Sequence, residues 1–110
     1  MSELVDDLDR ELDENGEDIV MFRVGGRSIS CRARIDAVTT EQIAAGIPAT
    51  EFNVIISPTQ PYATGFGLPA AGVTDKVIRT SVSQVPKAIT FVDPKIIGGE
   101  VVRINMRIAG

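Results

Sequence analysis

The 110-residue chain predicts a mainly β protein, a small β-barrel or sandwich of about six strands with an N-terminal α-helix and a long loop. Three observations support this fold class. Short segments alternate apolar and polar residues, Gly-Gly pairs at 25–26 and 98–99 separate such segments, and the first 16 residues follow a helical spacing instead. One domain fits this length, so we expect a single unit over 1–110, with an acidic helix over 1–16, a barrel over 17–110 and a long loop over 57–74.

The predicted helix covers about Glu3 to Glu14. Leu4, Leu8 and Leu12 recur every four residues, which places an apolar stripe on one side of a helix. Ser2 suits the N-cap, and Asn15-Gly16 predicts a left-handed stop at the other end.

The region after the helix changes to a period of two. Around the hairpin signal Gly25-Gly26, apolar residues from Ile29 to Ile35 alternate with polar ones. Cys31 belongs to the inward-facing set of this strand, which favours a buried small hydrophobe over a reactive thiol.

The remaining elements follow from capping and strand signals. Thr39 and Gln42 stand at capping-box spacing for a short helical turn that ends at Gly46. Asp93-Pro94 is expected to close the fifth strand, and the last strand alternates most clearly. The predicted strands of this part are Phe52–Ile56, Asp75–Thr80, Ala88–Val92 and Val101–Ile108.

The loop over 57–74 has an unusual composition. No charged residue occurs between Phe52 and Thr74, a stretch of 23 positions, but its prolines and glycines oppose a membrane-spanning helix. A loop of this length is either an interaction loop or a mobile one. A solvated loop has no need for the apolar side chains of Tyr62, Phe66 and Leu68 that this segment carries.

Charge is distributed unevenly along the chain. Residues 1–18 contain nine acids against Arg10 alone, a balance of minus eight, whereas the rest contains ten bases against six acids. A ring of identical subunits can set the acidic face of one subunit against the basic face of its neighbour. A solvated acidic helix is the alternative interpretation.

Arginines are predicted on the outward faces of two strands, where they form a basic patch if those strands are neighbours. Such a patch would contact an acidic partner, either the 1–18 helix of another copy or passing DNA. The alternative is a set of solubilising or edge-protecting charges. The candidate charged interface residues are Asp6, Asp9, Asp13, Arg32, Arg34, Arg103 and Arg107.

The composition argues against an enzyme. The chain has no histidine and a single cysteine, which removes the usual general base and the usual zinc ligand. An EF-hand register that starts at Glu11 fails because Phe22 takes the position of its bidentate glutamate. Gly65, Gly67 and Ala70 match only a weak fragment of a dinucleotide loop. We therefore expect no catalytic residue, no metal site and no cofactor.

The order of these elements along the chain resembles that of the small head-tail joining, or stopper, proteins of tailed bacteriophages. The resemblance is carried by the acidic helix, the hairpin at Gly25-Gly26, and the segments Asn53–Thr59, Asp75–Ile78 and Val92–Gly110. It covers most of the chain and is strongest from Asp75 onward.

This resemblance implies a structural virion protein without catalytic activity. Such a protein forms a homo-oligomeric ring, expected to be a hexamer, at the neck of the virion between the portal and adaptor proteins and the tail terminator or tail tube. The ring lines or closes the channel through which packaged DNA passes. Loop 57–74 would make the subunit or channel contacts, and its candidate apolar residues are Tyr62, Phe66, Leu68 and Pro69. The protein would be made in the host cytoplasm and would have no membrane partner. A tail terminator or tail completion ring protein and a soluble ligand-binding β-barrel remain the alternatives.

Overall fold

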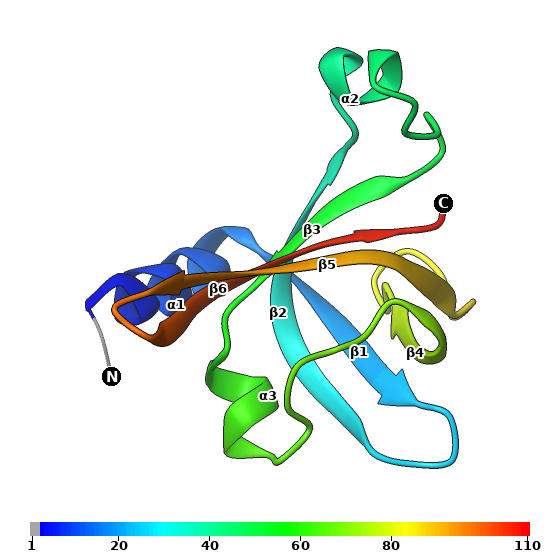
Figure 1. The fold of residues 1–110 in the computed structure, drawn as a ribbon. Coiled ribbons are helices and arrows are strands. Elements are labelled where there is room, and N and C mark those ends of the chain that lie inside the picture. Colours follow the sequence, from blue (N-terminus) through cyan, green and yellow to red (C-terminus); the bar gives the residue numbers. More distant parts are fainter. Residues whose placement is uncertain (1–2) are drawn as a thin grey trace.

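The structure, a computed structural model, describes residues 3–110 apart from the side chain of Val73. Six antiparallel strands close into a barrel in the order β1-β2-β3-β6-β5-β4, which confirms the predicted fold class (Figure 1). The strands are β1 (Glu17–Arg23), β2 (Ser28–Ala37), β3 (Phe52–Ile56), β4 (Gly72–Ile78), β5 (Lys87–Ile97) and β6 (Glu100–Ile108). The helices are α1 (Glu3–Asn15), α2 (Thr40–Ala44) and α3 (Thr59–Ala63).

Aliphatic side chains fill the barrel interior. The inward-facing residues alternate with outward-facing ones along each strand, as the period of two requires. Ile19 and Met21 of β1 meet Ile56, Val77 and residues of β6 in one continuous core. A small barrel of six strands leaves an interior that side chains occupy completely.

Helix α1 lies near its predicted position, but the structure at its C-terminal end differs from the prediction. Neither Asn15 nor Gly16 has a positive φ, so the expected left-handed stop is wrong. A Cβ atom at Gly16 would instead lie 2.5 Å from the Leu12 carbonyl oxygen and 2.9 Å from that of Ala33. Gly16 is therefore required by the close approach of α1 to β2. The expected cap, Ser2, lies outside the described residues.

The hairpin and the capping box confirm the sequence interpretation. β1 and β2 pair on either side of Gly25-Gly26, where Gly25 has a φ of 77°. The Thr39 side chain accepts a hydrogen bond from the backbone of Gln42, whose side chain in turn accepts from the Thr39 backbone. The turn they cap, α2, projects from the connection between β2 and β3.

Strand β5 continues through the position where it was expected to end. Pro94 pairs with Ile104 of β6, whereas the contact of β5 with β4 ends at Ile89. Beyond Ile89 one edge of β5 has no neighbouring strand, and an open edge tolerates a proline because no ladder hydrogen bond is needed there. The last part of β5 and the first part of β6 therefore form a two-stranded ribbon, which runs alongside α1 (Figure 1).

The segment over 57–74 is more ordered than the predicted loop. It contains the short helix α3, and β4 begins at Gly72, three residues before the expected start. The pair Ser57-Pro58, which favours a turn or a helix start, directly precedes α3. Only residues 64–71 connect α3 to β4 without regular structure.

Candidate interaction surface

The ion pair of Arg23 and Asp75 fastens segment 64–71 to the barrel. The Arg23 guanidinium donates from Nε to Asp75 Oδ1 at 2.8 Å and from Nη2 to Asp75 Oδ2 at 3.1 Å. The same guanidinium donates to the carbonyl oxygens of Phe66 and Leu68, and the Ala70 N–H donates to Asp75 at 2.8 Å. The side chains of Arg23 in β1 and Asp75 in β4 thus bind the backbone of segment 64–71 at three residues.

The aromatic ring of Phe66 fills the end of the barrel beneath this ion pair. Phe66 is 2% exposed and belongs to the hydrophobic core, and the Arg23 guanidinium carbon lies 4.3 Å from the centre of its ring. Gly65 and Gly67 both have a φ of 76°, which turns the chain inward and outward again around this side chain. Phe66 therefore acts as an internal anchor of segment 64–71.

The charge of Asp75 persists although the side chain is buried. Desolvation alone raises the pKa of this carboxyl, but hydrogen bonds from Arg23 and the Ala70 N–H, with the positive charge of Arg23, lower the pKa below its ordinary value. The bond to Asp75 raises the pKa of Arg23. Both partners stay ionised near neutral pH, so the segment stays fastened there.

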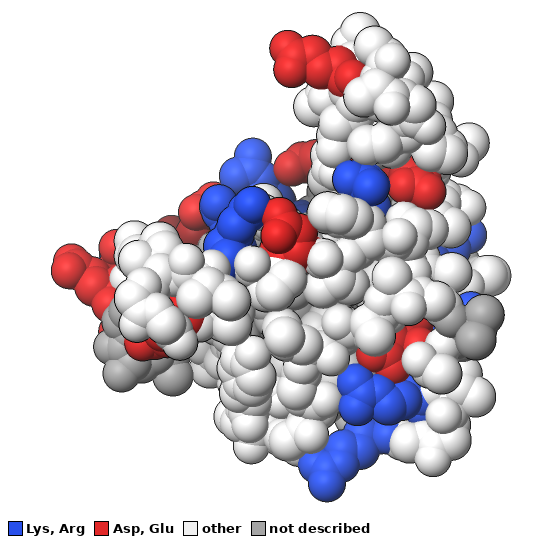
Figure 2. All heavy atoms as spheres, in the orientation of Figure 1, with Lys and Arg blue, Asp and Glu red and all other residues white. Residues whose placement is uncertain are grey.

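The predicted apolar contact residues divide into two pairs. Phe66 and Pro69 are buried in their own protomer, so their rings are not available to a partner in this conformation. Tyr62 is 48% exposed and Leu68 is 41% exposed. Figure 2 shows the surface over α3 as uncharged, with charged groups at its margins. We call the exposed uncharged surface formed by α3 and segment 64–71 the loop face.

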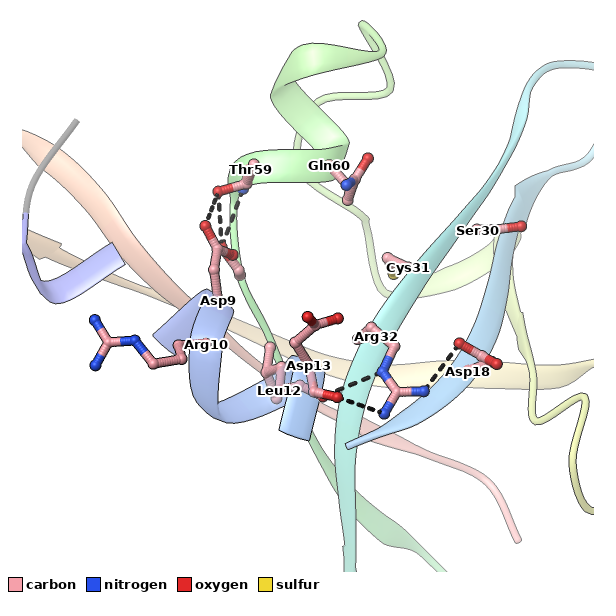
Figure 3. Close-up of a pocket in the computed structure, with 11 residues that line it drawn as sticks. Asp9, Arg10, Leu12, Asp13, Asp18, Ser30, Cys31, Arg32, Thr59 and Gln60 are labelled. Atoms are coloured by element: carbon pink, nitrogen blue, oxygen red, sulfur yellow. Dashed lines mark hydrogen bonds and ion pairs between the residues drawn. The ribbon is translucent and has the colours of Figure 1, made fainter. Parts of the chain in front are cut away.

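Arg32 binds the C-terminal end of α1. From β2 its guanidinium donates to the carbonyl oxygens of Leu12, Asp13 and Gly16 at 3.1, 3.1 and 2.7 Å, and it pairs with Asp18 at 3.1 Å (Figure 3). The last turn of α1 has no basic residue of its own. Arg32 therefore satisfies orphan carbonyls and complements the helix dipole.

The other predicted arginines do not gather either. β2 and β6 are separated by β3, so the condition for a shared basic patch is not met. Arg34 pairs with Glu11 of α1 and with Asp36, while Arg107 lies 3.5 Å from Glu51. The guanidinium of Arg107 also lies 4.1 Å from the centre of the Phe91 ring. Arg103 is exposed at a groove between α1 and the ribbon of β5 and β6.

The three predicted acidic contacts also differ in their surroundings. Asp9 accepts a hydrogen bond of 2.7 Å from the Thr59 hydroxyl, which ties α1 to α3 (Figure 3). The side chains of Asp6 and Asp13 are exposed on α1. Two of the three thus remain available to a partner.

A polar cleft lies between α1, β2 and α3 (Figure 3). Its walls include Asp9, which accepts a hydrogen bond from Thr59, the ion pair of Arg32 and Asp18, and the thiol of Cys31. Cys31 is 8% exposed, and burial raises its pKa to about 12, so the thiol is buried and unreactive, in agreement with the prediction from its position in the strand. Across residues 3–110, acidic and thiol groups form no cluster of three or more able to hold a metal ion. The helices among these residues include none that is long and apolar enough to cross a membrane.

Sequence reasoning missed the pair of Arg23 and Asp75. The two residues are 52 positions apart, and nothing in the local pattern links them. One signal was present, because Asp75 falls in the inward-facing set of its strand together with Val77. A carboxylate at an inward position requires a buried partner.

Comparisons with known proteins give no relative: no family model matches the chain, and neither a curated protein nor a solved structure does.

Proposed function

We propose that this chain is a structural virion protein, a head-tail connector of the stopper type in a tailed bacteriophage. The observation that carries the proposal is the loop face, an uncharged surface with exposed Tyr62 and Leu68, whose segment 64–71 is fastened by Arg23 and Asp75. Exposed apolar side chains on a fixed surface favour a binding role, because contact with water does not stabilise them. The type of assembly, a ring at the virion neck, is inferred from the resemblance of the sequence to head-tail joining proteins.

In this proposal the protomer forms a homo-oligomeric ring, taken as a hexamer, at the neck of the virion. Its partners are the portal and adaptor proteins above and a tail terminator or the tail tube below, and packaged DNA passes through the channel. The loop face makes contacts between subunits or toward the channel. A tail terminator is the nearest alternative within the same class.

The filled barrel favours a structural role over a ligand-binding one. The interior positions of all six strands are taken up by core side chains such as Ile19, Val54 and Ile104. Small barrels that hold a ligand keep space for it between the strands. Binding to the outside of the barrel, as in an assembly, needs no such space.

The proposal is tested by removing the exposed apolar groups of the loop face. The double variant Tyr62→Ser, Leu68→Ser is supplied in cells infected by a phage that lacks the wild-type gene, and tailed particles are counted by electron microscopy. Because both side chains are exposed, the isolated domain should remain folded while the yield of tailed particles falls at least about tenfold.

A matched control is the double variant Val82→Ser, Val85→Ser, because both valines are exposed in the turn between β4 and β5. The control should support normal particles. Normal yields from the Tyr62 and Leu68 variant would contradict the role of the loop face in assembly.

A further inference from the structure

The structure leaves the asparagine of the pair Asn15-Gly16 without the role that the sequence predicted for it. Gly16 is required by the close approach of α1 to β2, whereas Asn15 does not have the positive φ of a left-handed stop. Asn15 is the last residue of α1, and it is exposed. An exposed asparagine followed by glycine is chemically labile, because glycine has no side chain to hinder the approach of its backbone nitrogen to the asparagine amide.

The reaction to which such a pair is prone is deamidation. The backbone nitrogen of Gly16 attacks the side-chain carbonyl carbon of Asn15, the bond from that carbon to Nδ2 breaks, and ammonia leaves. Water then opens the succinimide ring at either of its carbonyl groups, which leaves aspartate or isoaspartate at position 15. Water is the only co-reactant, and a groove of about 310 Å³ lined by Glu11, Asn15, Gly16 and Arg34 gives it access to the pair.

The folded chain restrains the attacking nitrogen. The Gly16 N–H donates to the Leu12 carbonyl oxygen at 2.9 Å, which completes the last turn of α1. The Gly16 carbonyl oxygen accepts a hydrogen bond of 2.7 Å from Arg32 Nη2, and the same guanidinium binds the carbonyl oxygens of Leu12 and Asp13 (Figure 3). We call these three bonds the Arg32 clamp. Because both peptide groups of Gly16 are bonded, its nitrogen can turn toward the Asn15 side chain only after the end of α1 opens, and the open population sets the rate.

We propose that Asn15 is a site of spontaneous deamidation and that the Arg32 clamp sets its rate. The product loosens α1 from β2. An isoaspartate adds one carbon atom to the main chain directly before Gly16, where the close approach to Leu12 and Ala33 leaves no space even for a Cβ atom. Either product also adds a negative charge at the C-terminal end of α1, where the helix dipole opposes it and the last turn has no basic residue. The inference does not depend on the proposed function.

The direct test follows the asparagines of the full chain by peptide mass spectrometry, with detection of isoaspartate, during incubation at mildly alkaline pH. In the urea-unfolded chain, Asn15 should deamidate at least about tenfold faster than Asn53 or Asn105, which are followed by valine and methionine. In the folded wild type the rate at Asn15 should fall at least about tenfold, because only the open fraction reacts. Hydrogen exchange of α1 amides should be faster in folded chains isolated after deamidation.

The role of the clamp is tested by Arg32→Lys, which keeps the charge but cannot reproduce the fork of the guanidinium. This variant should deamidate at Asn15 several-fold faster than the folded wild type. The matched control is Arg34→Lys, because Arg34 lines the same groove and pairs with Glu11 but does not bind the end of α1. Circular dichroism verifies that both variants are folded. If Arg32→Lys does not fold, the wild type in urea below its unfolding transition gives the readout, since local opening should already raise the rate at Asn15 there.

Three results would overturn the inference. A rate at Asn15 in the unfolded chain no higher than that at Asn53 would show that the site is not labile. Equal rates at Asn15 in the folded and unfolded wild type would show that the end of α1 does not restrain the reaction. A folded Arg32→Lys variant that deamidates no faster than the wild type would exclude the Arg32 clamp as the controlling contact.

Discussion

At the residue scale, Asp75 is the most consequential single position. Its carboxylate accepts hydrogen bonds from Arg23 and from the Ala70 N–H while being 1% exposed. Asp75→Asn keeps the shape but removes the charge, and we expect it to lower the free energy of unfolding by about 2 kcal/mol at pH 7. The loss is modest because Arg23 is 36% exposed and the pair is partly screened by water. Urea denaturation followed by circular dichroism measures it.

The pH dependence of this pair has a defined sign. The pKa of Asp75 is lower in the folded state than in the unfolded state, so its stabilisation is complete above the unfolded value of about 4. The stabilisation is lost as the pH falls through the folded pKa. The stability difference between wild type and Asp75→Asn should therefore be largest near pH 7 and shrink below about pH 4. An unchanged difference at pH 3 would exclude this linkage.

Phe66 and Leu68 are close in sequence but should respond very differently to mutation. Phe66→Ala removes a buried ring from the barrel end and should destabilise the fold by about 3 kcal/mol. Leu68→Ser removes an exposed side chain and should change stability by less than about 0.5 kcal/mol. Thermal unfolding of the two variants distinguishes a residue that anchors segment 64–71 in the core from one that contacts a partner. Equal losses of stability would show that Leu68 is also part of the core.

The sequence reveals the direction of a side chain more readily than its distant partner. Cys31 is buried as its alternation with polar neighbours predicts. The same alternation places Arg32 outward, but only the folded chain brings its guanidinium to the end of α1. The sequence therefore could not show that the Arg32 guanidinium bonds to the end of α1.

At the scale of secondary-structure elements, α1 depends on its junction with β2. Gly16→Ala introduces a Cβ atom 2.5 Å from the Leu12 carbonyl oxygen and 2.9 Å from that of Ala33, so the backbone must shift. We expect this variant to displace α1 and to lower stability by about 2 kcal/mol. Gly26→Ala is the control, because its Cβ atom would meet Arg23 at an ordinary 3.4 Å. Hydrogen exchange of α1 amides should accelerate only in Gly16→Ala.

Periodicity predicts strands well where one face is buried and poorly where strands leave the barrel. β2 and β6 follow their alternating patterns closely. β5 runs past Pro94 because its neighbour β4 ends first, and a neighbour's length is not visible in the sequence of β5 itself. The helix α3 is too short, at five residues, to produce a periodic signal.

At the scale of the whole molecule, charge separates along the chain but is partly neutralised by folding. Arg32 and Arg34 of the barrel pair with Asp18, Glu11 and Asp36, so part of the acidic excess is met within the protomer. Contacts between copies that rely on the remaining acidic charge of α1 should weaken with ionic strength. We expect the association constant to fall several-fold between about 50 and 500 mM salt, as measured by sedimentation. An association that strengthens with salt would indicate purely apolar contacts.

The location of the protein in the particle tests the central claim most directly. An antibody raised against the purified chain, or a gold label on a tagged chain, is applied to particles from the source lysate and imaged by electron microscopy. The proposed connector function predicts label at the junction of head and tail. Label absent from every intact and partly opened particle, with the protein recovered in the soluble fraction, would contradict it.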